Sequence, residues 1–329
     1  MKKTTPFIFI IVFAIAVLLI APFIGSIKIP FSALTDLDVT TIAAKIFYHI
    51  RLPRILTAFI AGAALACCGV ALQAMFRNPL ATPFTLGISG GAAFGAAIYV
   101  IFAAVIPMYL GSVVFSCAGA LAAVLGVYGL TRIKKGFSVG TMLLAGITVN
   151  FFFSSLILFL QYISDFTQSF RIIHWLMGSM SITGYSTPIT MFALTTIGST
   201  IIIAQSTKLN LISISDEIAM ARGVNIRAAR KILFFATSVM VAAVVAFCGP
   251  IGFVGLMAPH ICRLLVGPDH KILTPASILF GGAFLVLCDT IARTVIAPAE
   301  IPVGVITALL GGPFFLWLLI GGSSEKSPL

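Results

Sequence analysis

The sequence has very little charge and none of the short motifs that mark common catalytic sites. Only 9% of its 329 residues are charged, and 9 residues are acidic. No H-E-x-x-H and no G-x-x-x-x-G-K-[ST] occurs, which excludes a zincin site and a nucleotide-binding loop within this chain. The 6 cysteines lie in apolar runs without C-x-x-C spacing, so we expect neither a disulfide framework nor a metal site.

Apolar residues take the place of the missing charge. Hydrophobic residues make up 60% of the chain and the mean hydropathy is +1.16, which places it in the membrane class. A spanning helix needs about 20 mostly apolar residues, because hydrocarbon cannot satisfy backbone amides. We count about ten such runs and predict an all-α membrane protein. The runs are Phe7 to Ile24, Ile55 to Phe76, Leu86 to Ile106, Gly111 to Thr131, Thr141 to Ile163, Ile189 to Gln205, Ile232 to Phe247, Phe253 to Val266, Leu273 to Ile296, and Val303 to Ile320.

Two of these runs differ from an ordinary span. The eighth is short and is bracketed by glycine and proline, so we expect a broken or tilted helix buried among its neighbours. The first follows a basic start and could pass for a secretory signal. It is longer than a typical signal core and has no clear small-x-small cleavage site, so we predict an uncleaved span that starts in the cytoplasm.

The distribution of basic residues indicates the orientation. Ten alternating spans with both termini inside agree with the positive-inside rule. The net charge of +11 then mostly reflects the basic residues that set the membrane orientation, and it gives no reason to expect nucleic-acid binding. The cytoplasmic side collects fourteen of the 20 basic residues: Lys2, Lys3, Arg77, Arg132, Lys134, Lys135, Lys208, Arg222, Arg227, Arg230, Lys231, Arg263, Lys271 and Lys326. The outer side keeps Lys28, Lys45, Arg51, Arg54, Arg171 and Arg293.

Rows of small residues indicate close packing of the predicted helices. Gly87, Gly91 and Gly95 form one row, and Ala58, Gly62 and Ala66 form another. We therefore expect a compact bundle and one domain over residues 1–329. The two longer outer loops, Gly25 to Arg54 and Ser164 to Pro188, are too short to be domains, and the second contains "FRIIHWLMGSM", which suggests a short interfacial helix.

One pattern raises the alternative of an intramembrane serine protease. "GISGG", Gly87 to Gly91, satisfies the G-x-S-x-G pattern, but Ser89 opens a membrane helix and not the strand-turn-helix of a nucleophile elbow. A rhomboid-like protease would also need a histidine near Ser89, and His260 is the one candidate in an apolar run. Ten spans exceed that fold, so this alternative is weak.

Charged residues inside the spans raise a second alternative. Asp289 and Arg293 lie four apart and predict an ion pair near the outer end of the ninth span. An ion-coupled secondary transporter would need acids near mid-bilayer, whereas Asp289 lies toward the outer end. Arg51, Arg54 and Arg293 share the outer side, where three gathered arginines would form an acid-binding rim.

Polar residues in the fifth span share one helical face. Asn150, Ser154 and Gln161 are spaced over about three turns. They either hydrogen-bond between helices or line a polar pathway.

A charged island interrupts the apolar pattern at "SDEIAMARGVNIRAARK", Ser215 to Lys231. Ser215 and Asp216 are good helix starters, Gly223 is a natural terminator, and Asn225 can cap a second helix that runs into the seventh span. The pattern predicts helix, turn, helix on the cytoplasmic side.

Part of this island resembles a known signature. "EIAMARG", Glu217 to Gly223, is similar to the E-A-A-x-x-x-G signature of bacterial ABC importer permeases and departs from it at Ile218. Three further stretches, in matching order from Arg51 to Leu319, resemble the type II importer permeases for ferric siderophores, haem and cobalamin. They are "RLPRILTAFIAGAALACCGVALQAMFRNPLATPFTLGISGGAAFG", "GPIGFVGLMAPHICRLLVGPDHK" and "AEIPVGVITALLGGPFFLWLL".

The resemblance implies a non-enzymatic permease subunit with about ten transmembrane helices. It would sit in a bacterial or archaeal cytoplasmic membrane, in contact with lipid, and would pair with a second permease copy. Two cytoplasmic ATPases that bind ATP and Mg would complete the importer, together with a periplasmic or lipid-anchored substrate-binding protein. Alternating access would move a ferric siderophore, haem or cobalamin inward.

The resemblance also implies roles for individual residues. The coupling element would lie within residues 207–230, with contacts from Ser215, Asp216, Glu217, Ala219, Arg222, Gly223, Val224, Asn225 and Arg227. Arg51, Arg54 and Arg293 would receive glutamates of the binding protein. The pathway would include Asn150, Ser154 and Gln161, and the cytoplasmic gate region would include Ser138, Val139 and Thr141.

Overall fold

The structure is a computed structural model that describes residues 4–25, 27, 29–30, 36, 39–103, 111–133 and 138–321. Every regular element in these ranges is helical. The helices are α1 (Thr4–Ile20), α2 (Ile42–Ile46), α3 (Leu52–Phe76), α4 (Ile88–Phe102), α5 (Gly111–Ile133), α6 (Val139–Ile163), α7 (Phe166–Leu176), α8 (Ser186–Ala204), α9 (Ser206–Ile212), α10 (Asp216–Ala221), α11 (Ile226–Cys248), α12 (Val254–Val266), α13 (His270–Ala292) and α14 (Val303–Gly321). A π-turn over Phe47–Arg51 joins α2 to α3, and short 3₁₀ turns cover Ala21–Phe23 and Pro83–Leu86.

The ten predicted apolar runs each correspond to a helix of the bundle. Seven helical stretches are long and apolar enough to cross a membrane, and α4, α12 and α14 supply three shorter apolar helices. The eighth run forms α12, which has 13 residues and contains Pro259. At 1.5 Å per residue it rises only about 20 Å, short of the roughly 30 Å hydrocarbon core. The expected short helix is therefore confirmed.

One predicted loop is partly wrong. The sequence predicts a loop over the outer segment from Gly25 to Arg54, but the second half of this segment is helical from Ile42 and runs into α3 as one stretch to Phe76. Pro53 lies directly after the π-turn, at the second residue of α3, where the hydrogen-bond pattern of the stretch changes.

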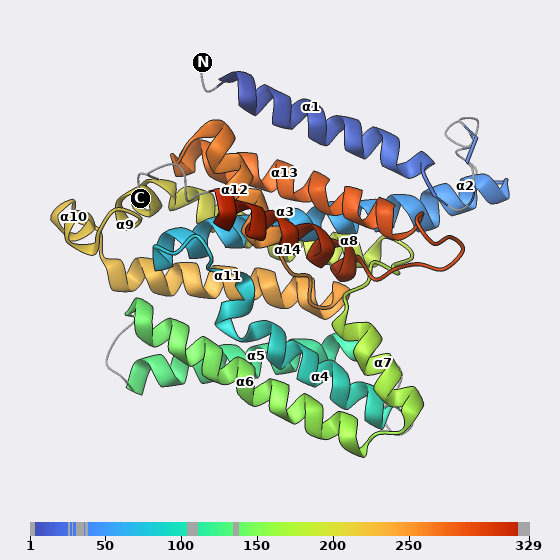
Figure 1. Cartoon of the computed structure of the whole chain (residues 1–329), viewed down its shortest axis with the longest axis horizontal. Coiled ribbons are helices and arrows are strands. Elements are labelled where there is room, and N and C mark those ends of the chain that lie inside the picture. Colours follow the sequence, from blue (N-terminus) through green and yellow to red (C-terminus); the bar gives the residue numbers. More distant parts are fainter. Residues whose placement is uncertain are drawn as a thin grey trace.

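Helix α3 lies at the centre of the bundle (Figure 1). It packs against α13, α12, α8 and α11, while α4, α5 and α6 form a further layer that contacts α11. Glycines set the closest approaches. A Cβ on Gly62 would lie 2.2 Å from the carbonyl oxygen of Gly281 in α13, and one on Gly69 would lie 1.8 Å from that of Gly255 in α12. The predicted small-residue packing of α3 is confirmed.

The predicted row of Gly87, Gly91 and Gly95 contacts two different helices. Gly91 and Gly95 bring α4 against α5, where a Cβ would lie 2.3 Å from the Gly119 oxygen and 1.9 Å from the Phe115 oxygen. Gly87 instead precedes α4 in a left-handed conformation and faces Gly146 of α6. The short helix expected in the second outer loop is also present, as α7, with Asp165 and Gln168 forming a capping box.

The bundle has two distinct ends along its long axis (Figure 1). The short helices α9 and α10 lie at one end, together with the first turn of α1 and the last turn of α14. Helices α2 and α7 lie at the other end.

Six of the basic residues assigned to sides from the sequence lie outside the described residues, as does the predicted end of the third span at Ile106. The six are Lys2, Lys3, Lys28, Lys134, Lys135 and Lys326.

Candidate functional site

The charged island folds as the sequence predicts. The Ser215 hydroxyl caps α10 by accepting the Ile218 N–H at 3.0 Å, and the Asn225 side chain caps α11 by accepting the Ala228 N–H at 3.1 Å. Gly223 makes the turn between them with φ +80°. The second helix runs into the seventh span as predicted, because α11 continues without a break to Cys248.

A small core fixes α10 in place. Two of the residues assigned to coupling, Ala219 and Val224, are buried in a cluster with Ile212 and with Ile226 and Ala229 of α11. They therefore hold the helix and do not face outward. Other members of the assigned set, Glu217, Arg222, Gly223 and Arg227, are exposed.

The outward face of α10 also carries exposed apolar side chains. Ile218 and Met220 of α10 are exposed at 43% and 57%, and Ile214, two residues before the helix, is exposed at 63%. Apolar side chains held outward by a rigid helix, among charged ones, are typical of a surface that a protein partner covers.

Asp216 connects α10 to two long helices. Its carboxylate accepts hydrogen bonds from Arg230 Nη2 of α11 at 2.9 Å and lies 3.5 Å from Nη2 of Arg77. Arg77 is the C-cap of α3, in a left-handed conformation with φ 49°. These contacts join α10 to the end of α3 and to the first turns of α11.

Neighbouring Glu217 is solvated and ionised. Hydrogen bonds from its own backbone N–H and from the Ser215 side chain hold the pKa of Glu217 below its ordinary value. It therefore presents a negative charge beside the helix N-terminus throughout the neutral range.

At the opposite end, an ion cluster forms around Arg54. Its Nε lies 3.0 Å from both carboxylate oxygens of Asp289, and its Nη2 lies 2.8 Å from Oδ1. Its Nη1 donates to both oxygens of Glu300, at 3.0 and 2.8 Å. Arg293 Nε lies 3.8 Å from Asp289, so the predicted i,i+4 pair exists, but Arg54 makes the closer contacts with Asp289.

The other two arginines donate to backbone carbonyls. Arg51 Nη1 donates to the Pro22 oxygen at 2.8 Å, and Arg51 Nη2 donates to the Ile27 oxygen. Arg293 Nη2 donates to the Ala21 oxygen at 2.7 Å. The segment after α1 is thereby attached to this cluster.

The three predicted arginines are brought together, but not as an open rim. Arg51, Arg54 and Arg293 line one pocket of about 190 Å³, and all three are buried. The expectation of an exposed rim is corrected on this point, because the guanidinium groups already have partners within the chain. Glu300, which no pattern in the sequence singles out, is the half-exposed member of the cluster; it lies within the stretch "AEIPVG".

Neither alternative function finds its site in the structure. Asp289 is neutralised by Arg54 and Arg293, which leaves no unpaired acid inside the described spans for ion coupling. Ser89 Oγ and His260 Nε2 have no hydrogen-bond partner among the described residues, and the His260 ring packs against Phe314 and Phe315. A serine–histidine pair is therefore not formed.

The polar residues of α6 are half-buried. Asn150 packs against the start of α4, where a Cβ on Gly90 would lie 2.6 Å from Asn150 Oδ1. Ser154 and Gln161 follow on the same helix. At the start of α6, Ser138 accepts the Thr141 N–H at 3.2 Å, and the two hydroxyl oxygens lie 2.8 Å apart, with Val139 between them in the sequence. These two hydroxyls form a helix cap.

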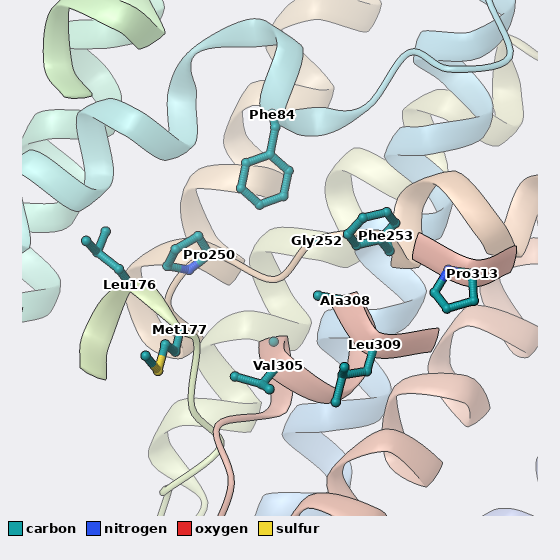
Figure 2. A pocket seen from close by; sticks show the side chains of 11 residues that line it. Phe84, Leu176, Met177, Pro250, Gly252, Phe253, Val305, Ala308, Leu309 and Pro313 are labelled. Atoms are coloured by element: carbon teal, nitrogen blue, oxygen red, sulfur yellow. The ribbon is translucent and has the colours of Figure 1, made fainter. Parts of the chain in front are cut away.

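A large apolar pocket lies against α14 (Figure 2). It measures about 670 Å³, and Phe84 points into it from one side while Val305, Ala308 and Leu309 line it from α14. Phe253, also in its wall, has φ 66°, a conformation that costs a non-glycine residue about 1–3 kcal/mol and is found mainly at functional sites.

Glycines let α14 approach the chain around this pocket. A Cβ on Gly304 would lie 2.1 Å from the Met177 oxygen, and one on Gly311 would lie 2.2 Å from the Phe253 ring. The polar residues of α6 do not line this pocket.

Comparisons with known proteins agree with these features. The FecCD transport family matches residues 10–321. The hemin transport system permease protein HmuU of Yersinia pestis is 38% identical over 306 residues, which cover 92% of this chain and 91% of the relative. The cobalamin import system permease protein BtuC of Halobacterium salinarum is 38% identical over 294 residues, which cover 89% of this chain and 78% of the relative.

A solved structure has the same fold. A transporter described as of the metal-chelate ABC type, in an inward-facing conformation, matches with a TM-score of 0.84 at 33% identity. The match covers 97% of this chain and 99% of that one. The chain therefore belongs to the FecCD transport family and is the transmembrane permease subunit of an ABC importer, a transport subunit whose ATP is bound by a separate ATPase.

Proposed function

We propose that this permease imports a metal chelate from the periplasm to the cytoplasm by alternating access. The chelate would be a ferric siderophore, haem or cobalamin. Each copy of the chain would form one permease domain, and two copies would pair as a homodimer. The dimer would assemble with two ATPases that bind ATP and Mg and with one substrate-binding protein. Both termini would lie in the cytoplasm. The relatives named for hemin and cobalamin, and the neighbour described as of the metal-chelate type, support this class of cargo.

The attachment of α10 carries the coupling part of this proposal. A helix that docks on an ATPase must be rigid, must expose a contact face and must be linked to the spanning helices. The buried cluster under α10 gives rigidity, its exposed Ile218 and Met220 give the face, and Asp216 gives the link to Arg77 and Arg230. Closure of the ATPases would then move α3 and α11 and change which side the permease opens to.

The coupling role is tested by measuring two activities in the same proteoliposomes. Glu217→Ala and Met220→Asp should lower cargo uptake per ATP hydrolysed by roughly tenfold, because they alter the exposed contact face, while membrane insertion stays intact. Lys271→Ala, an exposed lysine at the start of α13 and outside residues 207–230, is the control and should change neither activity. Normal coupling in both α10 variants would remove this helix from the interface.

The arginine cluster is proposed as the docking site for the binding protein. Acidic side chains of that protein would reach Arg51, Arg54 and Arg293 at the end of the bundle opposite α10. Charge reversal at Arg51 should weaken docking at least tenfold at low ionic strength and less at high salt, because salt screens the attraction between the acidic partner surface and the arginine cluster. Lys45→Glu, on α2, is the control for a general change in surface charge, and unaltered docking of the Arg51 variant would contradict the assignment.

The apolar pocket on α14 supports a cargo route beside that helix. It is an apolar hollow of about 670 Å³, and Phe253 in its wall has a strained backbone. In the proposed dimer the second copy would close it from the open side, with Asn150, Ser154 and Gln161 of α6 contributing farther along the route. Ser138, Val139 and Thr141 remain the proposed gate region at the start of α6.

A further inference from the structure

A second hollow, here called the α8/α11 groove, lies away from α14. Ile197, Gly198 and Ile201 of α8 line one side, and Lys231, Ile232, Phe235, Ala236 and Val239 of α11 line the other. Its volume is about 380 Å³, and Lys231 is the one residue in this lining that is not apolar. The groove shares no residue with the pocket on α14.

The groove has a length close to the hydrocarbon depth of one membrane leaflet. Lys231 and Val239 are eight residues apart on α11, which is about 12 Å along the helix axis. One leaflet contributes about 15 Å of hydrocarbon. A single extended acyl chain that begins beside Lys231 would therefore fill the groove to Val239.

Lys231 marks one end of the groove, and one further basic residue lies a helical turn away on each of the two helices in contact there, α5 and α11. Lys231 Nζ lies 5.5 Å from the centre of the Tyr128 ring, which belongs to α5. Arg132 lies one turn beyond Tyr128 on α5, and Arg227 lies one turn before Lys231 on α11, so both are on the faces that meet here. Lys231, Arg132 and Arg227 are exposed and form no ion pair with another described residue.

From this arrangement we propose that the α8/α11 groove binds an anionic phospholipid. Its phosphate would contact Lys231 and Arg132, with Arg227 at the edge, and one acyl chain would lie between α8 and α11. The positive-inside assignment puts these cations at the cytoplasmic membrane surface, where each Lys or Arg near an anionic headgroup contributes about 1 kcal/mol. A zwitterionic lipid would bring its own cation to this cluster and lose part of that attraction.

A lipid fits this groove better than a second copy of the chain. The groove is a narrow apolar slot between two helices, while charge gathers at one end only, as in a lipid with one headgroup and a long tail. The proposed dimer contact lies at α14, which contributes nothing to the groove. The exposed side chains beside the groove on α8, among them Phe192 and Ile203, are apolar, as expected for a face in hydrocarbon.

Native mass spectrometry of the purified full-length permease tests the site. After removal of lipid, the protein is incubated with phosphatidylglycerol or with phosphatidylcholine of the same acyl chains, and bound lipid is counted. The wild type should retain several-fold more phosphatidylglycerol. The double variant Lys231→Gln/Arg132→Gln should retain the two lipids equally, because only the headgroup attraction is removed.

Two further variants separate the headgroup from the groove. Val239→Trp, at a half-exposed position, fills the far end of the groove and should lower phosphatidylglycerol retention although the cations remain. Lys208→Gln, an exposed lysine outside the groove, should behave as the wild type. Inorganic phosphate at millimolar concentration should not displace the lipid, because it lacks the acyl chain.

Four results would overturn the proposal. They are equal retention of the two lipids by the wild type, unchanged selectivity in the double variant, wild-type retention by Val239→Trp, and displacement by inorganic phosphate. The last two would mean that the cations bind a phosphate without the groove. None of these results depends on the cargo or on ATPase coupling.

Discussion

Asp289 is the most enclosed carboxylate among the described residues, with 1% of its side chain exposed. Arg54 contacts both of its oxygens, and Arg293 Nε lies 3.8 Å away. Removal of one partner of such a buried pair is costly, since the other charge stays buried without compensation. Glu300 shares Arg54 from a half-exposed position and contributes much less.

We therefore expect two different stability losses in this cluster. Asp289→Asn should lower the free energy of unfolding by about 3–5 kcal/mol, because the Arg54 guanidinium loses its buried counter-charge. Glu300→Gln should cost about 1 kcal/mol or less, because its carboxylate is 46% exposed and screened. Thermal unfolding of the detergent-solubilised variants measures both, and equal losses would contradict this division of roles.

Glu300 also competes with any acidic partner for Arg54. Both oxygens of Glu300 accept hydrogen bonds from Arg54 Nη1. A carboxylate of the docking protein can therefore bind this nitrogen only if Glu300 gives up these hydrogen bonds. Glu300→Gln should therefore tighten docking of the binding protein several-fold, as titrated by surface plasmon resonance. Docking that weakens in this variant would show that Glu300 holds the surface in shape and does not compete.

At the scale of helices, packing depends on a few glycines of α3. Gly62 and Gly69 allow α13 and α12 to approach within carbonyl contact, and no Cβ can be accommodated at either position without a shift of backbone. The caps of α10 and α11 act at the same scale, because they fix where the charged island turns.

Gly69→Ala should destabilise the bundle by about 1–3 kcal/mol, because its Cβ would collide with the Gly255 oxygen. Gly129→Ala on α5 is the matched control, since no atom of a neighbouring residue lies within 4 Å of the position that an alanine Cβ would take there. This control should be neutral or slightly stabilising, because alanine favours a helix over glycine. Thermal unfolding of the two variants side by side tests the contact, and equal stability would contradict it.

The sequence predicts elements that depend on local chemistry. Runs of apolar residues mark the spans, Ser215 and Asn225 mark helix starts, and Gly223 marks the turn, because each acts within a few residues of itself. The start of α3 could not be predicted in this way, because Pro53 and the charges of "RLPR" look like a loop when their tertiary partners are unknown. The link between Arg54 and Asp289 joins positions 235 apart, so local spacing favoured Arg293 instead.

Across the whole molecule, α3 connects the two proposed partner surfaces. It carries Arg54 in its first turn and ends at Arg77, which lies 3.5 Å from Asp216 of α10. Its 25 residues rise about 37 Å, roughly the thickness of the membrane. The helix is continuous and tightly packed, so a displacement at one end can reach the other as a rigid-body motion.

The most direct test of the account is cargo uptake into proteoliposomes that contain this permease, its ATPase and its binding protein. We expect uptake of a ferric chelate, haem or cobalamin to require ATP on the ATPase side and to continue when all ion gradients are dissipated. The Glu217→Ala variant should hydrolyse ATP while uptake falls. Uptake that persists without ATP, or that stops when an ion gradient is removed, would contradict an ATP-driven importer.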